Sequence, residues 1–122
     1  MIDAIRVVVV DDERDVRTLL RLQLEGSGFS VVGEAADGAE AIELCRELEP
    51  DAAVVDLLMP GITGFEAIPE LRRTNPTMAI VAYTAVAGDF VRAEMARLRI
   101  PLLLKSGDPS SLTTKLRELV DE

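Results

Sequence analysis

Five polar residues stand at the ends of short apolar runs of the sequence, and all five can take part in phosphoryl chemistry. They are Asp11, Asp12, Asp56, Thr84 and Lys105. Carboxylates bind divalent cations, and an ionised aspartate can also attack as a nucleophile. A threonine hydroxyl can donate a hydrogen bond to a phosphoryl oxygen, and a lysine ammonium can pair with another. These residue types favour magnesium-dependent phosphoryl transfer, provided that the fold brings the side chains together.

Apolar runs and amphipathic segments alternate along the chain and define the elements that must hold these side chains. Unbroken runs predict strands buried on both faces, as in a parallel sheet covered by helices, at residues 7–10, 31–32, 52–55, 78–82 and 100–104. Apolar residues at helical spacing predict helices at residues 14–24, from Asp37 to the stop at Pro50, at residues 65–73 and 89–98, and from Asp108 onward. Pro69 is expected to kink or shorten the third helix.

This alternation predicts the fold class. Strand and helix repeat about five times without a linker, a low-complexity segment or an internal repeat. Crossovers between parallel strands are nearly always right-handed. We therefore expect a single α/β domain over residues 1–122, with a five-stranded parallel sheet and helices on both faces. Five strands suggest the flavodoxin-like order 2-1-3-4-5, which the sequence alone does not prove.

The predicted strand order places the polar residues at one edge of the sheet. The first and third strands would be neighbours about 4.8 Å apart, so Asp11, Asp12 and Asp56 would share a small pocket. Thr84 would lie one strand beyond Asp56. Lys105 would lie two strands away, about 10 Å, which its long side chain can largely cross.

A cluster of this kind needs a counter-charge. Three neighbouring carboxylates repel each other, so that either one takes up a proton or a cation neutralises them. Mg²⁺ suits a site made entirely of oxygen ligands, and a carbonyl near Leu58 could be a further ligand. A bound cation would leave Asp56 free to act as a nucleophile.

Composition excludes several classes of function. The chain carries 22 Asp and Glu against 13 Lys and Arg, a net charge of −9, and this balance disfavours nucleic-acid binding. It has 0 histidines, which excludes Ser-His-Asp and Cys-His catalysis and a phosphohistidine on this chain. One cysteine cannot form an internal disulfide, and no apolar run approaches a membrane span, so we expect a cytoplasmic protein without membrane contact.

Each residue of the cluster also has an ordinary structural interpretation. Asp11 and Asp12 could simply cap the first helix, and Asp56 could be a solvated turn residue. Lys105 could be a surface lysine, although the chain has only one other, Lys115. The grouping of all these residues at one predicted edge favours a functional site over these separate explanations. Cys45 lies on an apolar helical stripe and is expected to be a core residue.

The same residues resemble the receiver domain of bacterial two-component response regulators. Residues 7–13 resemble the family's first strand and acidic pair, and residues 54–64 resemble its phosphoacceptor segment with a Met-Pro-Gly turn and a later glycine. Thr84-Ala85 resembles the position of the hydroxyl, and residues 102–105 resemble the last strand with its lysine. The resemblance covers essentially the whole chain and is closest to the subgroup that often carries a helix-turn-helix output domain.

The resemblance implies a role for each site residue. Asp56 would accept a phosphoryl group from a sensor histidine kinase or a phosphotransfer protein, and Thr84 and Lys105 would bind that group. The implied Mg²⁺ ligands are Asp11, Asp12, Asp56 and the Leu58 carbonyl. Phosphorylation would switch an output surface on the last two helices and strand, which contacts an output domain or a partner protein, and a homodimer is possible. The domain would catalyse only its own phosphotransfer and autodephosphorylation.

Some residues depart from the pattern of the family, and other functions are also compatible with the sequence. Leu102 occupies the position of a frequent aromatic residue, Ser106 that of a frequent proline, and residues 97–101 replace a small turn that contains glycine. One rival is a small magnesium-dependent phosphatase with an aspartyl nucleophile, although that class places its nucleophile after the first strand. Other rivals are a flavin-binding flavodoxin-like protein, which would need a phosphate-binding loop after that strand, and a degenerate receiver that acts as a scaffold.

Overall fold

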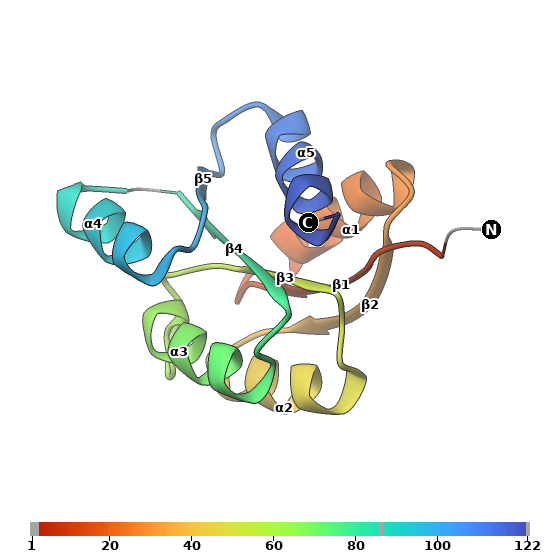
Figure 1. Ribbon diagram of the computed structural model, residues 1–122. Coiled ribbons are helices and arrows are strands. Elements are labelled where there is room, and N and C mark those ends of the chain that lie inside the picture. Colours follow the sequence, from red (N-terminus) through yellow and green to blue (C-terminus); the bar gives the residue numbers. More distant parts are fainter. Residues whose placement is uncertain (1–2, 86, 122) are drawn as a thin grey trace.

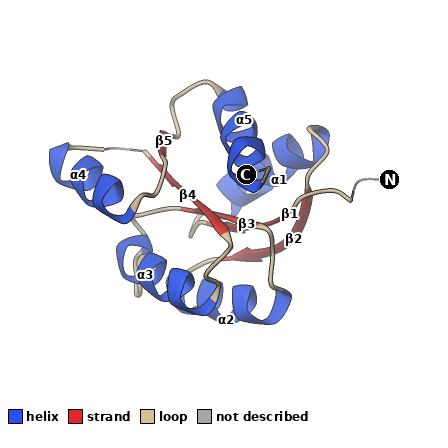
Figure 2. Cartoon of the chain, in the orientation of Figure 1, coloured by secondary structure: helices blue, strands red, loops and turns tan. Residues whose placement is uncertain are grey.

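The computed structural model describes residues 3–85 and 87–121 of the chain and shows ten alternating elements (Figures 1 and 2). The strands are β1 (Arg6–Val10), β2 (Ser30–Ala35), β3 (Ala52–Val55), β4 (Ala79–Thr84) and β5 (Leu102–Leu104). The helices are α1 (Arg14–Gly26), α2 (Gly38–Leu48), α3 (Gly64–Thr74), α4 (Asp89–Leu98) and α5 (Pro109–Val120). Each predicted strand and helix is present, with ends that differ by a few residues.

The strands form one parallel sheet in the order β2-β1-β3-β4-β5, which confirms the predicted flavodoxin-like topology. Figure 1 shows α1 and α5 on one side of the sheet and α2 and α3 on the other. Side chains alternate along the strands, so Val7 and Val9 pack toward α1 and α5, whereas Val8 and Val10 pack toward α2, α3 and α4. The sheet therefore separates two apolar cores.

Burial of the strands depends on their place in the sheet. The central strands β1 and β3 are buried almost throughout, as the unbroken apolar runs predict. The prediction is wrong for the edge strands: β2 is only partly buried, and β5 is half-buried with Leu104 exposed. An edge strand has a neighbour on one side only, and this explains the exposure of β5. The strand β2 extends through Gly33 and Glu34 because these residues pair with Val8 and Val9 of β1.

Local sequence explains where the helices begin and end. The Asp37 side chain caps α2, the Thr63 and Glu66 side chains form a capping box at α3, and Asp108 caps α5. Pro69 lies inside α3, which nevertheless continues to Thr74, so the expected shortening does not occur. The helix α4 ends at Leu98, and its C-cap residue Arg99 adopts a left-handed conformation with φ of 59°.

Candidate functional site

The carboxylates predicted from the sequence converge at the carboxyl ends of β1 and β3. Val10 pairs with Val55 in the sheet, and the Asp56 amide donates a hydrogen bond to the Val10 carbonyl at 2.9 Å. Asp11, Asp12 and Asp56 each offer a carboxylate oxygen, and these oxygens lie within 4.8 Å of one another. Asp11 and Asp56 are buried and Asp12 is exposed, so the cluster is open to solvent on the Asp12 side.

Asp56 is held by two nitrogen groups but remains an unfavourable place for a negative charge. Its Oδ1 accepts a hydrogen bond from the Leu58 amide at 3.2 Å, and the Lys105 Nζ lies 3.4 Å from Oδ2. Burial raises the pKa of Asp56, the charge of Asp11 raises it further, and the contacts with Leu58 and Lys105 offset only part of this shift. The folded chain therefore favours a positive group beside this carboxylate.

Lys105 reaches across the sheet and binds Asp11 more closely than Asp56. Its Nζ lies 2.6 Å from Asp11 Oδ2, whereas Asp11 Oδ1 accepts a hydrogen bond from the Glu13 amide at 2.9 Å. Burial alone would lower the pKa of Lys105, but the hydrogen bond to Asp11 and the charges of both aspartates raise it. The ammonium group thus stays charged and supplies part of the counter-charge of the cluster.

Thr84 and Leu102 occupy adjoining strands beside the cluster. Thr84 is fully buried at the end of β4, and its carbonyl accepts a hydrogen bond from the Lys105 amide at 2.8 Å. Leu102 packs against the core on the side of α2, α3 and α4, whereas Tyr83 packs on the opposite side, as strand alternation predicts. The hydroxyl-bearing residue and the lysine are therefore fixed to each other through the backbone.

Gly64 allows α3 to begin directly against the phosphoacceptor segment. A Cβ atom at this position would lie 2.2 Å from the Asp56 carbonyl oxygen and 2.7 Å from the Leu57 Cα. The Gly64 amide donates a hydrogen bond to the Leu57 carbonyl at 3.2 Å. The sequence shows this glycine only as part of a motif, and its physical role becomes visible in the packing.

The structure tests the ordinary interpretations of single residues. The N-cap of α1 is Glu13, so Asp11 and Asp12 are not its cap residues. Asp56 is 5% exposed and is not a solvated turn residue. Cys45 is fully buried, and burial raises the pKa of its thiol to about 11, which confirms the predicted core position.

Arg17 is the residue near the site that sequence reasoning missed. It lies on α1, and its Nη1 donates a hydrogen bond to the Asp11 carbonyl at 2.7 Å while its Nε binds Glu34 at 3.1 Å. An arginine on an amphipathic helix ordinarily belongs to the solvated face, so the sequence carries no signal of this contact.

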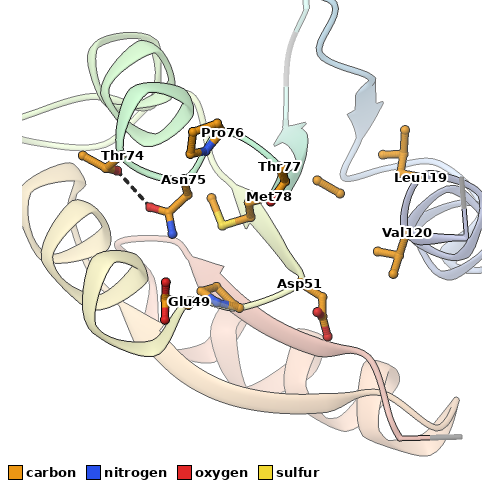
Figure 3. A pocket seen from close by; sticks show the side chains of 11 residues that line it. Glu49, Asp51, Thr74, Asn75, Pro76, Thr77, Met78, Leu119 and Val120 are labelled. Carbon is orange, nitrogen blue, oxygen red and sulfur yellow. Dashed lines mark hydrogen bonds between the residues drawn. The ribbon is translucent and has the colours of Figure 1, made fainter.

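The surface has a groove beside the cluster and a second hollow at the opposite ends of the strands. A groove of about 640 Å³ adjoins the cluster and is lined by Val16, Leu19, Leu20, Leu22, Gln23, Tyr83, Lys105 and Pro109. Another, of about 380 Å³, lies at the amino ends of β3 and β4, where Figure 3 shows Asp51, Thr77 and the end of α5 around it. Within the described residues this second hollow contains none of the predicted site residues.

The sheet topology and the acidic, lysine-bearing pocket define a flavodoxin-like domain with a candidate phosphoacceptor site. Residues 7–117 match the family described as the response regulator receiver domain. The chain therefore belongs to this family, which confirms the recognition and the receiver function predicted from the sequence, and nothing in the comparisons supports the phosphatase alternative.

Individual relatives agree with this assignment. The chain is similar to the response regulator GacA of Pseudomonas viridiflava, with 44% identity over 86 residues, 70% of this chain and 40% of the relative. It is similar to the chemotaxis protein CheY of Thermotoga maritima, with 37% identity over 66% of this chain and 68% of CheY. A LuxR-family two-component response regulator from Aurantimonas sp. SI85-9A1 has 32% identity and a TM-score of 0.90, covering 98% of this chain and 86% of that chain.

Membership in the family carries some general properties. Receiver domains are in general switches rather than turnover enzymes, and they bind Mg²⁺ at an acidic pocket. The chain spans only 40% of the GacA relatives that it matches. In the described part of the chain, no helix combines the length and hydropathy of a membrane span.

Proposed function

We propose that Asp56 is the phosphoacceptor of this receiver domain, that Asp11, Asp12, Asp56 and the Leu58 carbonyl bind Mg²⁺, and that Thr84 and Lys105 bind the phosphoryl group. The observation that carries this proposal is the convergence of three carboxylate oxygens within 4.8 Å, with a lysine ammonium 3.4 Å from Asp56. The donor set consists of oxygens, and burial together with the charge of Asp11 raises the pKa of Asp56, so a positive group beside it would be favourable. Both features suit a hard divalent cation.

The side chains divide the chemistry of phosphotransfer among them. A bound Mg²⁺ would supply positive charge that offsets the charge of the incoming phosphoryl group. An Asp56 oxygen forms a bond to phosphorus while the bond from phosphorus to the donor nitrogen breaks and the donor imidazole departs. Lys105 pairs with a phosphoryl oxygen, and the Thr84 hydroxyl donates a hydrogen bond to another. The added charge of about −1.5 to −2 then biases the segments that follow β4 and β5.

The partner of the first step is a sensor histidine kinase or a phosphotransfer protein. The apolar groove beside Lys105 supports docking of such a donor, because it joins the site directly and presents the exposed Leu19 and Leu22 side chains. An apolar helical surface that carries a phosphohistidine fits this groove. The output partner binds the face formed by α4, β5 and α5, where Phe90 and Leu104 are exposed. A homodimer could use the same output face.

The proposal extends to the domain as a whole. Residues 1–122 form one receiver domain that works in the cytoplasm and removes its own phosphoryl group by hydrolysis. The net charge of −9 supports recognition of proteins rather than nucleic acid. Any DNA-binding activity would belong to a separate output domain.

Phosphorylation by a small donor tests the assignment of Asp56. Acetyl phosphate with Mg²⁺ should add the mass of one phosphoryl group to the wild-type chain and none to Asp56→Asn. Asp51→Asn is the matched control, because Asp51 precedes β3 at the amino ends of the strands, far from the cluster. Its carboxylate accepts a hydrogen bond from the Arg6 amide. Undiminished phosphorylation of Asp56→Asn would remove Asp56 from this role.

A further inference from the structure

Arg17 joins the acidic loop to the neighbouring edge strand. Its guanidinium donates from Nη1 to the Asp11 carbonyl at 2.7 Å and from Nε to Glu34 Oε1 on β2 at 3.1 Å. The Arg17 side chain is 16% exposed, so both contacts are partly shielded from water. A charge-assisted hydrogen bond in such a place is stronger than one at an open surface.

The hydrogen bond from Arg17 to the Asp11 carbonyl restricts the orientation of the next residue, Asp12. The Asp11 carbonyl and the Asp12 amide belong to one rigid peptide plane, so a donor that holds this carbonyl also limits the direction of the Asp12 side chain. Asp11 itself has its amide and both carboxylate oxygens hydrogen-bonded. Within the described residues, the Asp12 carboxylate has no hydrogen bond or salt bridge that could orient it.

We propose that Arg17 is a positioning residue for cation binding, which fixes the peptide between Asp11 and Asp12 so that the Asp12 carboxylate faces the cation. This inference rests on the proposed function, because it assigns Arg17 a role at the same magnesium site. Arg17 does not touch the cation or the phosphoryl group and acts only through the backbone of Asp11.

Glu34 makes the arrangement compatible with cation binding. Its carboxylate lies between two guanidinium groups, 3.1 Å from Arg17 and 2.8 Å from Arg21. Burial would raise the pKa of Glu34, but the hydrogen bonds and charges of the two arginines lower it. The ionised Glu34 offsets the charge of Arg17, so the guanidinium can hold the loop with less repulsion of an incoming cation.

Arg21 offers a matched control on the same helix. It binds the other oxygen of Glu34 through Nε, and its Nη1 donates to the Val31 carbonyl at 3.2 Å. Arg17 and Arg21 therefore share a carboxylate partner and each bind one backbone carbonyl, but only Arg17 binds a carbonyl of the acidic loop. Arg21 also contacts Glu25 at 3.4 Å, and its side chain is 35% exposed against 16% for Arg17. Arg21→Met therefore removes one further exposed ion pair but leaves the acidic loop untouched.

Magnesium titration of the purified chain separates the two roles. Arg17→Met should weaken Mg²⁺ binding at least tenfold, in the range of about 10- to 100-fold that is typical when a partner of a metal ligand is lost. Arg21→Met should retain wild-type affinity although its melting temperature also falls, because it loses the shared Glu34 contact and a backbone hydrogen bond. Saturating Mg²⁺ should restore the rate at which Arg17→Met takes phosphate from acetyl phosphate, and Arg17→Lys should recover part of the affinity.

The outcomes distinguish this inference from the proposed function. Asp12→Ala is measured alongside as a change in a proposed ligand. Loss of affinity in Asp12→Ala with wild-type affinity in Arg17→Met would overturn the positioning role and leave the magnesium site intact. Equal affinity of the wild-type chain and Asp12→Ala would overturn the magnesium site itself. Equal weakening in Arg17→Met and Arg21→Met would show a general structural effect and also overturn the positioning role.

Discussion

Asp56→Asn is expected to stabilise the metal-free chain, although it removes the proposed phosphoacceptor. In the cluster, carboxylate oxygens lie within 4.8 Å of one another, and two unit charges at that distance repel by about 3.5 kcal/mol at an effective dielectric constant of ~20. Lys105 lies 3.4 Å from Asp56, which corresponds to an attraction of about 5 kcal/mol on the same basis. The repulsion from Asp11 and Asp12 together exceeds this attraction by about 2 kcal/mol, and solvent around Asp12 reduces the excess to about 1 kcal/mol.

Thermal unfolding in chelator and in Mg²⁺ measures this effect. A gain of about 1 kcal/mol corresponds to a rise of roughly 4 °C in the melting temperature of a chain of this size. Mg²⁺ at 100 times its dissociation constant should stabilise the wild-type chain by about 2.7 kcal/mol, and Asp56→Asn by less because it has lost a ligand. The two proteins should therefore exchange their order of stability when Mg²⁺ is added.

The stability of the wild-type chain is expected to fall as the pH rises above the ordinary pKa of an aspartate. The pKa of Asp56 is raised in the folded chain, so above the ordinary pKa of 3.8 folded Asp56 keeps a proton that unfolded Asp56 has lost. The free energy of unfolding of the wild-type chain therefore falls as the pH rises from 3.8 through the raised pKa. The advantage of Asp56→Asn should be absent below this pH range and fully developed at neutral pH. A lower melting temperature of Asp56→Asn in chelator at neutral pH would show that burial and repulsion do not outweigh the contacts with Lys105 and Leu58. Asp51→Asn should show no gain.

Three further changes test the packing and the lifetime of the phosphorylated state. Gly64→Ala should lower the free energy of unfolding by more than about 3 kcal/mol and slow phosphorylation, because the new Cβ would lie 2.2 Å from the Asp56 carbonyl oxygen. Denaturant unfolding measures this effect, and wild-type stability would contradict the close approach. Arg99→Gly should raise stability by about 0.5–1 kcal/mol, because glycine adopts a positive φ without strain; a lower melting temperature would argue against strain there. By their resemblance to the family, the apolar residues Leu58 and Val86 are expected to flank the phosphoryl group and shield it from water; Val86 lies outside the described residues. Leu58→Asn with Val86→Glu should therefore speed loss of the phosphoryl group, measured as the phosphorylated mass over time. Unchanged decay would show that these two side chains do not set its lifetime.

The central part of the fold could be predicted from the sequence because it follows from burial. Residues 52–55 form a continuous apolar run, which is what a strand covered on both faces requires, and β3 has these bounds. The edge strand β2 begins and ends beyond the predicted residues 31–32, because Gly33 and Glu34 break the apolar run while still pairing with β1. Pattern reasoning fails where only one side of a strand is paired.

The candidate site could be predicted in its membership but not in its contacts. Strand order places Asp11, Asp56 and Lys105 at one edge, and the structure brings them together there. The sequence does not show that Lys105 lies nearer to Asp11 than to Asp56, since this depends on the path of a flexible side chain. It also does not show that Arg17 holds the Asp11 carbonyl, because a backbone partner leaves no trace in residue spacing.

Localisation of the phosphoryl group on the wild-type chain tests directly whether Asp56 is the phosphoacceptor. The chain is incubated with acetyl phosphate and Mg²⁺, the acyl phosphate is reduced with borohydride to an alcohol, and the modified residue is identified by peptide mass mapping. We expect modification of Asp56 alone and none when Mg²⁺ is withheld. Modification of Asp11 or Asp12, or equal modification without Mg²⁺, would contradict this assignment.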